Sequence, residues 1–289
     1  YPFPFLAISF AFHIHDFAED GRPANYRAML DRMGEGRSDV LAAQLYPQGD
    51  HLHYAVLNNR DYQYLQEAGL PRDQLHLLPN PVDLGLVEGE DPPAAGIPPL
   101  WLYPTRAIRR KNLGEFLLWS ALGPKETWFA TTSGPENPAE QPRYQRWKQV
   151  AAELGLPMQF EMVGPESYGF IDLLRMADVA MTTSVAEGFG MAFLEPWILG
   201  TPVCGRNLHE VTDQFTDDGL RLSGCYERLD VPMDWFGETQ VRQAALSGLT
   251  RNLAAYGRKP EPGDLERVLK SWLRDGRVDF GRLNEAMQE

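Results

Sequence analysis

A run of basic residues between positions 105 and 112 is the first place where this sequence could do chemistry. The stretch reads Thr105-Arg106-Ala107-Ile108-Arg109-Arg110-Lys111-Asn112, with four cations within six positions. No Asp or Glu occurs between Pro92 and Gly114. Guanidinium and ammonium groups gathered in one loop bind anions, above all phosphates. The stretch therefore predicts a phosphate or diphosphate site, and the alternative is a solvated basic loop.

A glycine-containing turn is the second such place. It reads Glu187-Gly188-Phe189-Gly190-Met191-Ala192-Phe193-Leu194-Glu195, and it follows a predicted strand and opens a predicted helix. Because Gly188 and Gly190 carry no side chains, backbone N–H groups at the start of that helix can approach an anion. Glu195, five residues beyond Gly190, can then reach polar groups of the same ligand. The alternative is a glycine turn with two surface glutamates.

Together, the basic loop and the glycine turn describe a nucleotide-diphosphate site. Both follow strands of one predicted sheet, and open α/β sheets bind their ligands beyond the carboxyl ends of their strands. The sequence lacks both the Gly-x-x-x-x-Gly-Lys-Ser/Thr pattern and a Gly-x-Gly-x-x-Gly pattern after its first strand. A kinase, an ATPase and a dehydrogenase are therefore disfavoured.

The elements that must position these motifs are strands alternating with helices. We expect strands at residues 6–14, 54–57, 75–78, 100–103, 128–131, 159–163 and 179–182. We expect helices at residues 25–33, 60–68, 113–122, 145–154, 171–176 and 191–199. This alternation predicts βαβ units and parallel sheets, and hence an α/β fold.

Composition and charge exclude several classes of protein. The 289 residues are 43% hydrophobic and 23% charged, as is typical of globular proteins, and no apolar run approaches the ~20 residues that span a bilayer. The net charge of −13 disfavours general binding to nucleic acids. Cys204 and Cys225 fit neither a disulfide framework nor a zinc site, so we expect reduced thiols, a protein without a structural metal and a cytoplasmic location.

The glycine turn resembles the E-x7-E signature of retaining glycosyltransferases with the GT-B fold, especially family 4. The usual setting of that signature is present in order, as Thr182-Thr183-Ser184, then residues 187–190, Leu194-Glu195 and Gly200-Thr201-Pro202-Val203. Further matches are Arg106 with Lys111, Asn80-Pro81-Val82-Asp83 and His15-Asp16. The resemblance extends from about residue 8 to residue 215.

The resemblance implies two Rossmann-like, doubly wound domains facing a cleft, the first of them incomplete. Residues 1–84 would form a partial, acceptor-side domain, and residues 100–270 a domain that binds the nucleotide sugar. Residues 85–99 between them are acidic, rich in Pro and Gly and without an apolar period, which predicts a linker. Residues 271–289 would form a C-terminal helix that crosses back toward the first domain. Since the family's first domain begins about a hundred residues earlier, we expect a processed or partial chain.

The resemblance also implies a reaction, the transfer of a hexose from a UDP- or GDP-sugar with retained anomeric configuration. The acceptor, a sugar, lipid or small molecule, stays unknown. No cofactor is required beyond the donor, dependence on a divalent metal stays open, and contact with a membrane surface is allowed. The oligomeric state is not predicted.

The resemblance assigns roles to individual residues. Glu187 would lie beside the donor sugar as a catalytic residue, and His15 would face that sugar from the first domain. Donor binding would use Arg106, Lys111, Gly164, Phe189, Gly190, Met191, Ala192 and Glu195. Among these, Arg106 and Lys111 would neutralise the diphosphate, Glu195 would bind the ribose and Gly164 would lie near the base.

Two other functions stay open. His13-x-His15 on a strand places both imidazoles on one face, as in zinc-dependent hydrolases, and His51-x-His53 repeats the spacing. A metal-dependent hydrolase would leave the basic loop and the glycine turn unexplained. The other alternative is a non-catalytic nucleotide-sugar-binding fragment, which would keep the donor site without turnover.

Overall fold

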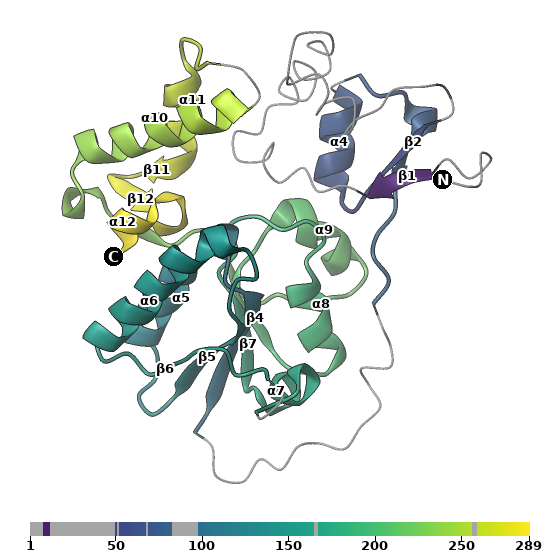
Figure 1. Cartoon of the computed structure of the whole chain (residues 1–289). Coiled ribbons are helices and arrows are strands. Elements are labelled where there is room, and N and C mark those ends of the chain that lie inside the picture. Colours follow the sequence, from purple (N-terminus) through teal and green to yellow (C-terminus); the bar gives the residue numbers. More distant parts are fainter. Residues whose placement is uncertain are drawn as a thin grey trace. The chain divides into compact units, whose positions relative to one another are not determined.

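A computed structural model gives the fold of the chain (Figure 1), and it describes residues 8–11, 50, 52–67, 69–82, 98–164, 167–255 and 259–289. The chain divides into two compact units. Unit 1 comprises Tyr1–Asn80 and Met233–Gly276, and unit 2 comprises Pro81–Pro232 and Arg277–Glu289. Both candidate motifs therefore belong to unit 2.

Unit 2 is built on a sheet of six parallel strands. They are β4 (Leu100–Arg106), β5 (Trp128–Ser133), β6 (Met158–Gln159), β7 (Val179–Thr182), β8 (Val203–Arg206) and β9 (Gly224–Tyr226). Their spatial order is β6-β5-β4-β7-β8-β9. Counted along the chain this is 3-2-1-4-5-6, the doubly wound order of Rossmann folds, in which the winding reverses between β4 and β7. The predicted parallel α/β fold is confirmed.

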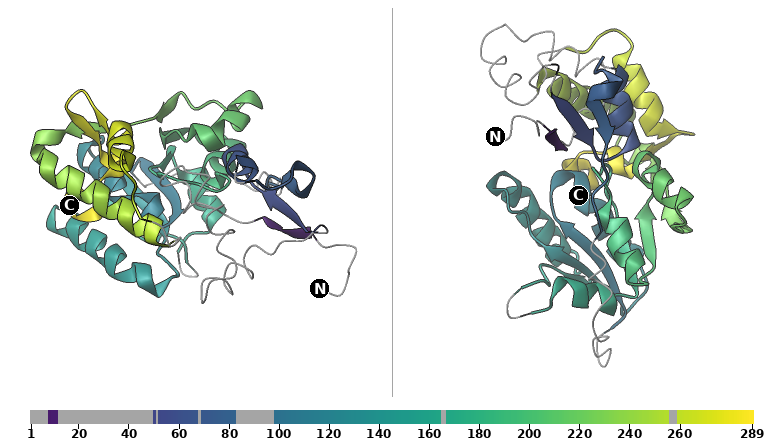
Figure 2. Two further views of the ribbon diagram at one scale, coloured as in Figure 1. Left: turned by 90° about the horizontal axis from the view of Figure 1, so that it is seen from above. Right: turned by 90° about the vertical axis from the view of Figure 1, so that its right-hand side faces the viewer.

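Helices cover both faces of this sheet, which appears as a single layer in the right-hand view of Figure 2. They are α5 (Leu113–Leu122), α6 (Gln141–Glu153), α7 (Phe170–Met176), α8 (Met191–Ile198) and α9 (His209–Asp217). On one face, Tyr103 of β4 packs in a buried cluster with Phe116 of α5 and Trp147 of α6. On the other face, Leu102 of β4 packs with Leu173 of α7. Alternating residues of β4 thus anchor both layers, as expected of a central strand.

The C-terminal segment differs from its prediction. The predicted helix over residues 271–289 is wrong: this stretch holds the end of α11 (Asp264–Trp272), β11 (Leu273–Arg274), β12 (Arg277–Asp279), a 3₁₀ turn at Phe280–Arg282 and only the short α12 (Glu285–Gln288). Asp275 and Gly276 adopt φ angles of 49° and 71°. Two successive left-handed residues reverse the chain and are incompatible with a helix. β12 pairs antiparallel with β10 (Asp230–Pro232), with Asp230 opposite Asp279.

Unit 1 contains a second parallel sheet. β1 (Ile8–Ala11), β2 (His53–Val56) and β3 (Leu75–Leu77) lie in the order β1-β2-β3, and α4 (Asn59–Glu67) connects β2 toward β3. The helices α10 (Glu238–Ala255) and α11 belong to the same unit. The three strands confirm the predicted ones: β1 and β3 are shorter than predicted, and β2 is shifted by one residue toward the N-terminus. The predicted helix at 25–33, the histidines 13, 15 and 51, and residues 85–97 of the predicted linker lie outside the described residues.

Candidate functional site

The two motifs meet at the reversal point of the unit 2 sheet. The basic loop follows β4, the glycine turn follows β7, and the amide of Val185 donates to the carbonyl of Arg110 at 2.9 Å. The hydroxyl of Tyr103, on β4, lies 2.8 Å from Ser184 Oγ and donates to the carbonyl of Lys111 at 2.7 Å. The crevice at such a reversal is where doubly wound sheets bind nucleotides. The predicted proximity of the two motifs is therefore present in the structure.

Glu187 lies at the centre of this contact. Its side chain is 7% exposed, and Lys111 Nζ forms an ion pair with Oε1. Arg110 Nη1 lies 2.9 Å from Oε2, and Ser184 Oγ donates to Oε1 at 2.7 Å. Each carboxylate oxygen of Glu187 thus accepts a hydrogen bond from the basic loop, and Oε1 accepts a second one from Ser184.

The ionisation of Glu187 follows from these partners. Burial by itself raises the pKa of Glu187, but the charges of Lys111 and Arg110 together with the hydrogen bonds outweigh burial and hold the pKa below its ordinary value. The carboxylate is therefore ionised at neutral pH. Two cations face this one anion, which leaves a net positive charge for a ligand.

The start of α8 offers donors beside these cations. Gly190 is the N-cap residue, with a φ of 94°, and it has no side chain that could accept from the first amides of the helix. The backbone N–H groups of residues 190–192 are thus available to an anion. One and a half turns along α8, burial raises the pKa of Glu195 although the charge of Lys111 opposes it. Among the described residues, none donates a hydrogen bond to this carboxylate, which leaves it available to the hydroxyl groups of a ligand.

The remaining predicted residues are distributed more widely. The Arg106 side chain is 68% exposed and pairs with Glu136 at 3.3 Å, away from Glu187. Phe189 is buried, with its ring edge-on to Phe215 at a centroid distance of 5.4 Å, so only its backbone can face a ligand. Gly164 accepts from the amide of Ser167 at 3.1 Å. His15 lies outside the described residues, and its role stays a prediction.

Three contributing residues were not singled out from the sequence. Arg110, rather than Arg106, joins Lys111 at Glu187, and Ser184 and Tyr103 complete the contact. Arg110 lay within the basic run and Ser184 within the Thr182-Thr183-Ser184 run, so both had a signal. Tyr103 had none, because a buried aromatic residue in a strand reads as core.

Two histidines that lie close together in unit 1 bear on the alternative of a metal site. His53 Nδ1 lies 2.8 Å from His76 Nε2, and the rings stack at a centroid distance of 5.0 Å. Over the described residues, no group of three or more His, Cys, Asp or Glu side chains is arranged to hold a metal ion. His13 and His15 are outside that part of the chain, so the hydrolase hypothesis itself is untested.

None of the described helices combines the length and the apolar character needed to cross a bilayer.

A family comparison covers the site. Residues 90–223 match the family described as "Glycosyl transferases group 1". Mannosylglucosyl-3-phosphoglycerate synthase of Petrotoga mobilis is 29% identical over 203 residues, which are 63% of this chain and 37% of that protein. The chain thus spans little more than a third of the length of this curated relative. The matched family residues include both the basic loop and the glycine turn.

Two solved structures share the fold. Alr3699/HepE of Anabaena, crystallised with UDP and glucose, has a TM-score of 0.51 and 17% identity, covering 69% of this chain and 52% of that one. The trehalose-6-phosphate synthase OtsA has a TM-score of 0.51 and 13% identity, covering 68% and 52%. The chain therefore has the Rossmann-like α/β architecture of GT-B glycosyltransferases.

Gly190 provides a test of the geometry at the start of α8. A Cβ at residue 190 would lie 2.8 Å from Val211 Cγ1, and a φ of 94° is unfavourable for any residue with a side chain. We expect Gly190→Ala to lower the free energy of unfolding by more than the 1–2 kcal/mol, roughly, that the φ angle alone costs. Affinity for nucleoside diphosphates should fall with it.

The matched control is Gly200→Ala, just beyond the C-terminal end of α8. Gly200 also has a positive φ, 78°, but a Cβ there meets nothing within 4 Å. Chemical denaturation and calorimetric titration with UDP or GDP would separate the two variants. Equal destabilisation, with UDP and GDP binding intact in both, would contradict the role given to Gly190.

Proposed function

We propose that this chain, with its group 1 glycosyl transferase segment at residues 90–223, transfers a hexose from a nucleoside diphosphate sugar with retention of the anomeric configuration. The observation that carries the proposal is the pairing of Arg110 and Lys111 with the uncapped start of α8 at the reversal point of the sheet. Cations and backbone N–H groups that converge at such a point suit a diphosphate.

The reaction places its growing negative charge on this diphosphate. As the bond between the sugar and the nucleotide breaks, the leaving nucleoside diphosphate gains charge, which fixed cations and N–H dipoles stabilise more in the transition state than in the ground state. Arg110 and Lys111 are held in place by Glu187, so little reorganisation is needed when the charge develops. Arg106, exposed at the end of β4, would add a further cation from the other side of the loop.

Glu187 is better suited to electrostatic work than to nucleophilic attack. Its two oxygens already accept from Lys111, Arg110 and Ser184, and its pKa is held low, so it is a weak nucleophile. An ionised carboxylate beside the donor sugar would stabilise an oxocarbenium-like transition state. This supports a front-face mechanism, in which the acceptor attacks the sugar from the side on which the nucleoside diphosphate leaves, without a covalent intermediate.

Residues of α8 and of the loop after β6 would bind the ribose and the base of the donor. The Glu195 carboxyl group, whose pKa is raised by burial and which accepts no hydrogen bond from the other described residues, suits the hydroxyls of a ribose. Gly164 would lie near the base. Uracil and guanine are both compatible with these residues, so UDP- and GDP-sugars are the two donor classes. His15 and the acceptor, a sugar, lipid or small molecule, would belong to the first domain.

The first test is thermal unfolding of the chain with UDP, GDP or ADP, each with and without EDTA. A ligand at about 100 times its dissociation constant stabilises a protein by roughly 2.7 kcal/mol, which gives a measurable shift of the midpoint. A shift with UDP or GDP that Lys111→Met abolishes and Lys148→Met retains would support the donor site. Lys148, on α6, is the matched control because it pairs with Glu161 and not with a residue of either motif. Destabilisation by EDTA alone, without any nucleotide effect, would favour the metal-dependent hydrolase.

The second test separates transfer from binding alone. The chain is incubated with the donor whose nucleotide shifts the midpoint and with a panel of acceptors, and the anomeric configuration of the product is read by NMR. Because the Petrotoga relative is named for a glycosylated phosphoglycerate, phosphoglycerate glycosides belong in that panel. Retained configuration supports the proposal, inversion overturns the retaining mechanism, and binding without release of nucleotide favours the non-catalytic alternative.

A further inference from the structure

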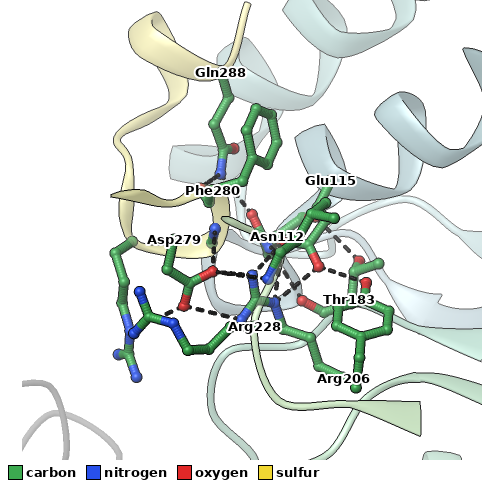
Figure 3. A network of polar contacts seen from close by, with 12 residues as sticks. Asn112, Glu115, Thr183, Arg206, Arg228, Asp279, Phe280 and Gln288 are labelled. Carbon is green, nitrogen blue, oxygen red and sulfur yellow. Dashed lines mark hydrogen bonds and ion pairs between the residues drawn. The ribbon is translucent and has the colours of Figure 1, made fainter. Parts of the chain in front are cut away.

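Asn112 ends the basic loop and joins it to α5. Its backbone is left-handed, with φ and ψ of 53°, and the residue is buried. The side-chain nitrogen donates to Glu115 Oε2 at 2.8 Å and to the carbonyl of Thr183 at 3.1 Å. The side-chain oxygen accepts from Gln288 Nε2 at 2.8 Å. A single buried amide thus links the basic loop to α5, to the loop after β7 and to the C-terminal segment (Figure 3).

The backbone next to Lys111 is fixed by the same group of contacts. Thr183 Oγ1 donates to the carbonyls of Lys111 and Asn112, both at 3.1 Å. The hydroxyl of Tyr103 also donates to the carbonyl of Lys111. The peptide that follows Lys111 is therefore held from β4 and from the loop after β7, and the direction in which the Lys111 side chain leaves the loop depends on this peptide.

A buried ionic cluster supports Asn112 from below. Glu115 accepts from Arg206 Nε at 2.8 Å, and Arg206 Nη2 also lies 2.5 Å from Asp279 Oδ1. The side chains of Arg206, Glu115 and Asp279 are 4%, 0% and 2% exposed. Figure 3 shows this cluster directly beside Asn112. Buried ionic clusters are often no more stabilising than apolar packing, so a geometric role is the better account of this one.

The C-terminal segment, Arg277–Glu289, reaches this network at two points. Asp279 enters through Arg206, and Gln288 bonds both Asn112 Oδ1 and the carbonyl of Phe280, each at 2.8 Å. Gln288 can approach because residue 114 is glycine: a Cβ there would lie 2.6 Å from Gln288 Oε1. The second-to-last residue of this chain is thus packed into the turn that carries the cations.

We propose that the C-terminal segment is a positioning element for the donor diphosphate. Gln288 and the Arg206 cluster fix Asn112, and Asn112 fixes the backbone from which Arg110 and Lys111 reach the ligand. The proposal rests on the proposed function, and Asn112 and Gln288 are positioning residues because they lie behind the loop that touches the donor. Displacement of a binding group by about 1 Å is enough to weaken its contact strongly.

The test compares the affinity of the full 289-residue chain for a nucleoside diphosphate with its affinity for the matching monophosphate. The pair is UDP and UMP or GDP and GMP, depending on which base the chain binds. Gln288→Ala removes the bonds to Asn112 and Phe280. We expect about tenfold weaker binding of the diphosphate, an unchanged affinity for the monophosphate and a lower kcat/KM for the donor sugar. A merely structural role would weaken both nucleotides alike. Glu289→Ala is the matched control, because it removes a surface ion pair with Arg146 from the adjacent residue.

Asn112→Gly is the second variant. Glycine keeps the left-handed backbone and deletes only the side-chain bonds, so the fold should survive. The same selective loss of diphosphate affinity in both variants supports positioning by the C-terminal segment. Wild-type diphosphate selectivity in both overturns it and leaves the donor site intact. A wild-type chain that binds none of these nucleotides overturns the proposed function and this inference together.

Discussion

Arg206→Met is expected to lower the free energy of unfolding by about 3–5 kcal/mol, the usual cost of leaving buried charges unpaired. Arg206 lies between Glu115 and Asp279, all three almost completely buried. Methionine fills much of the same space but donates no hydrogen bond. Glu115 would then lose its guanidinium partner, Asp279 would keep the more distant Arg282 at 3.8 Å, and the bonds that support Asn112 would weaken as well.

Thermal unfolding would show the effect as a fall in the midpoint of roughly 6–20 °C, since 1 kcal/mol corresponds to roughly 2–4 °C in a domain of this size. Arg146→Met is the control. It makes the same change at a side chain that is 41% exposed and pairs with Glu289 on the surface, and we expect its midpoint to match that of the wild type. Similar shifts for the two variants would mean that Glu115 and Asp279 tolerate the loss of Arg206 without the cost of an unpaired buried charge.

The effect of Arg206→Met should also depend on pH. Burial opposes ionisation of Asp279, but the hydrogen bonds and charge of Arg206 lower its pKa below the ordinary value. The stabilisation from Asp279 is therefore complete above the unfolded pKa, about 3.9, and is lost as the pH falls through the folded pKa. The folded variant is stabilised when Glu115 and Asp279 take up protons, because protonation removes their under-compensated negative charges. The difference between the two proteins should thus be largest near neutral pH and shrink toward pH 4.

Much of the fold could be predicted from the sequence because its elements are short and regular. The predicted limits of α5, Leu113–Leu122, and β7, Val179–Thr182, coincide with the structure. Each is an apolar run bounded by residues that end it. The C-terminal segment differs from its prediction because the left-handed residues Asp275 and Gly276 form a turn that interrupts the expected helix.

The site could be predicted only in part. The basic run and the glycine turn identified the loops, but spacing did not tell which guanidinium would reach Glu187. That choice depends on how the chain leaves β4: Arg106 ends the strand exposed, whereas Arg110 follows in a 3₁₀ turn beside Ala186. The Arg206 cluster had no sequence signal, since Glu115 and Asp279 lie 91 and 73 positions away from Arg206.

Lys111→Met is the change expected to affect nucleotide binding most. Lys111 is 13% exposed and pairs with Glu187, so its loss removes a desolvated cation from the diphosphate site. Truncation of one partner in a buried, hydrogen-bonded charge pair costs about 2–5 kcal/mol in binding, or at least about 30-fold in affinity. Stability should also fall, by about 2 kcal/mol, because Glu187 loses a charged partner but keeps Arg110 and Ser184.

Arg106→Ala, by contrast, should weaken nucleotide binding with the unfolding midpoint unchanged, since that side chain is 68% exposed.

The double variant Lys111→Met/Glu187→Gln separates these two effects. Glutamine removes the charge that Lys111→Met leaves under-compensated, so the unfolding midpoint should recover toward the wild-type value. Affinity for UDP or GDP should not recover, because the cation that contacts the diphosphate is still missing. Calorimetric titration and thermal unfolding on the four members of this cycle measure both quantities. If nucleotide binding returned together with stability, Lys111 would act only as the counter-ion of Glu187, and the diphosphate would have to bind elsewhere.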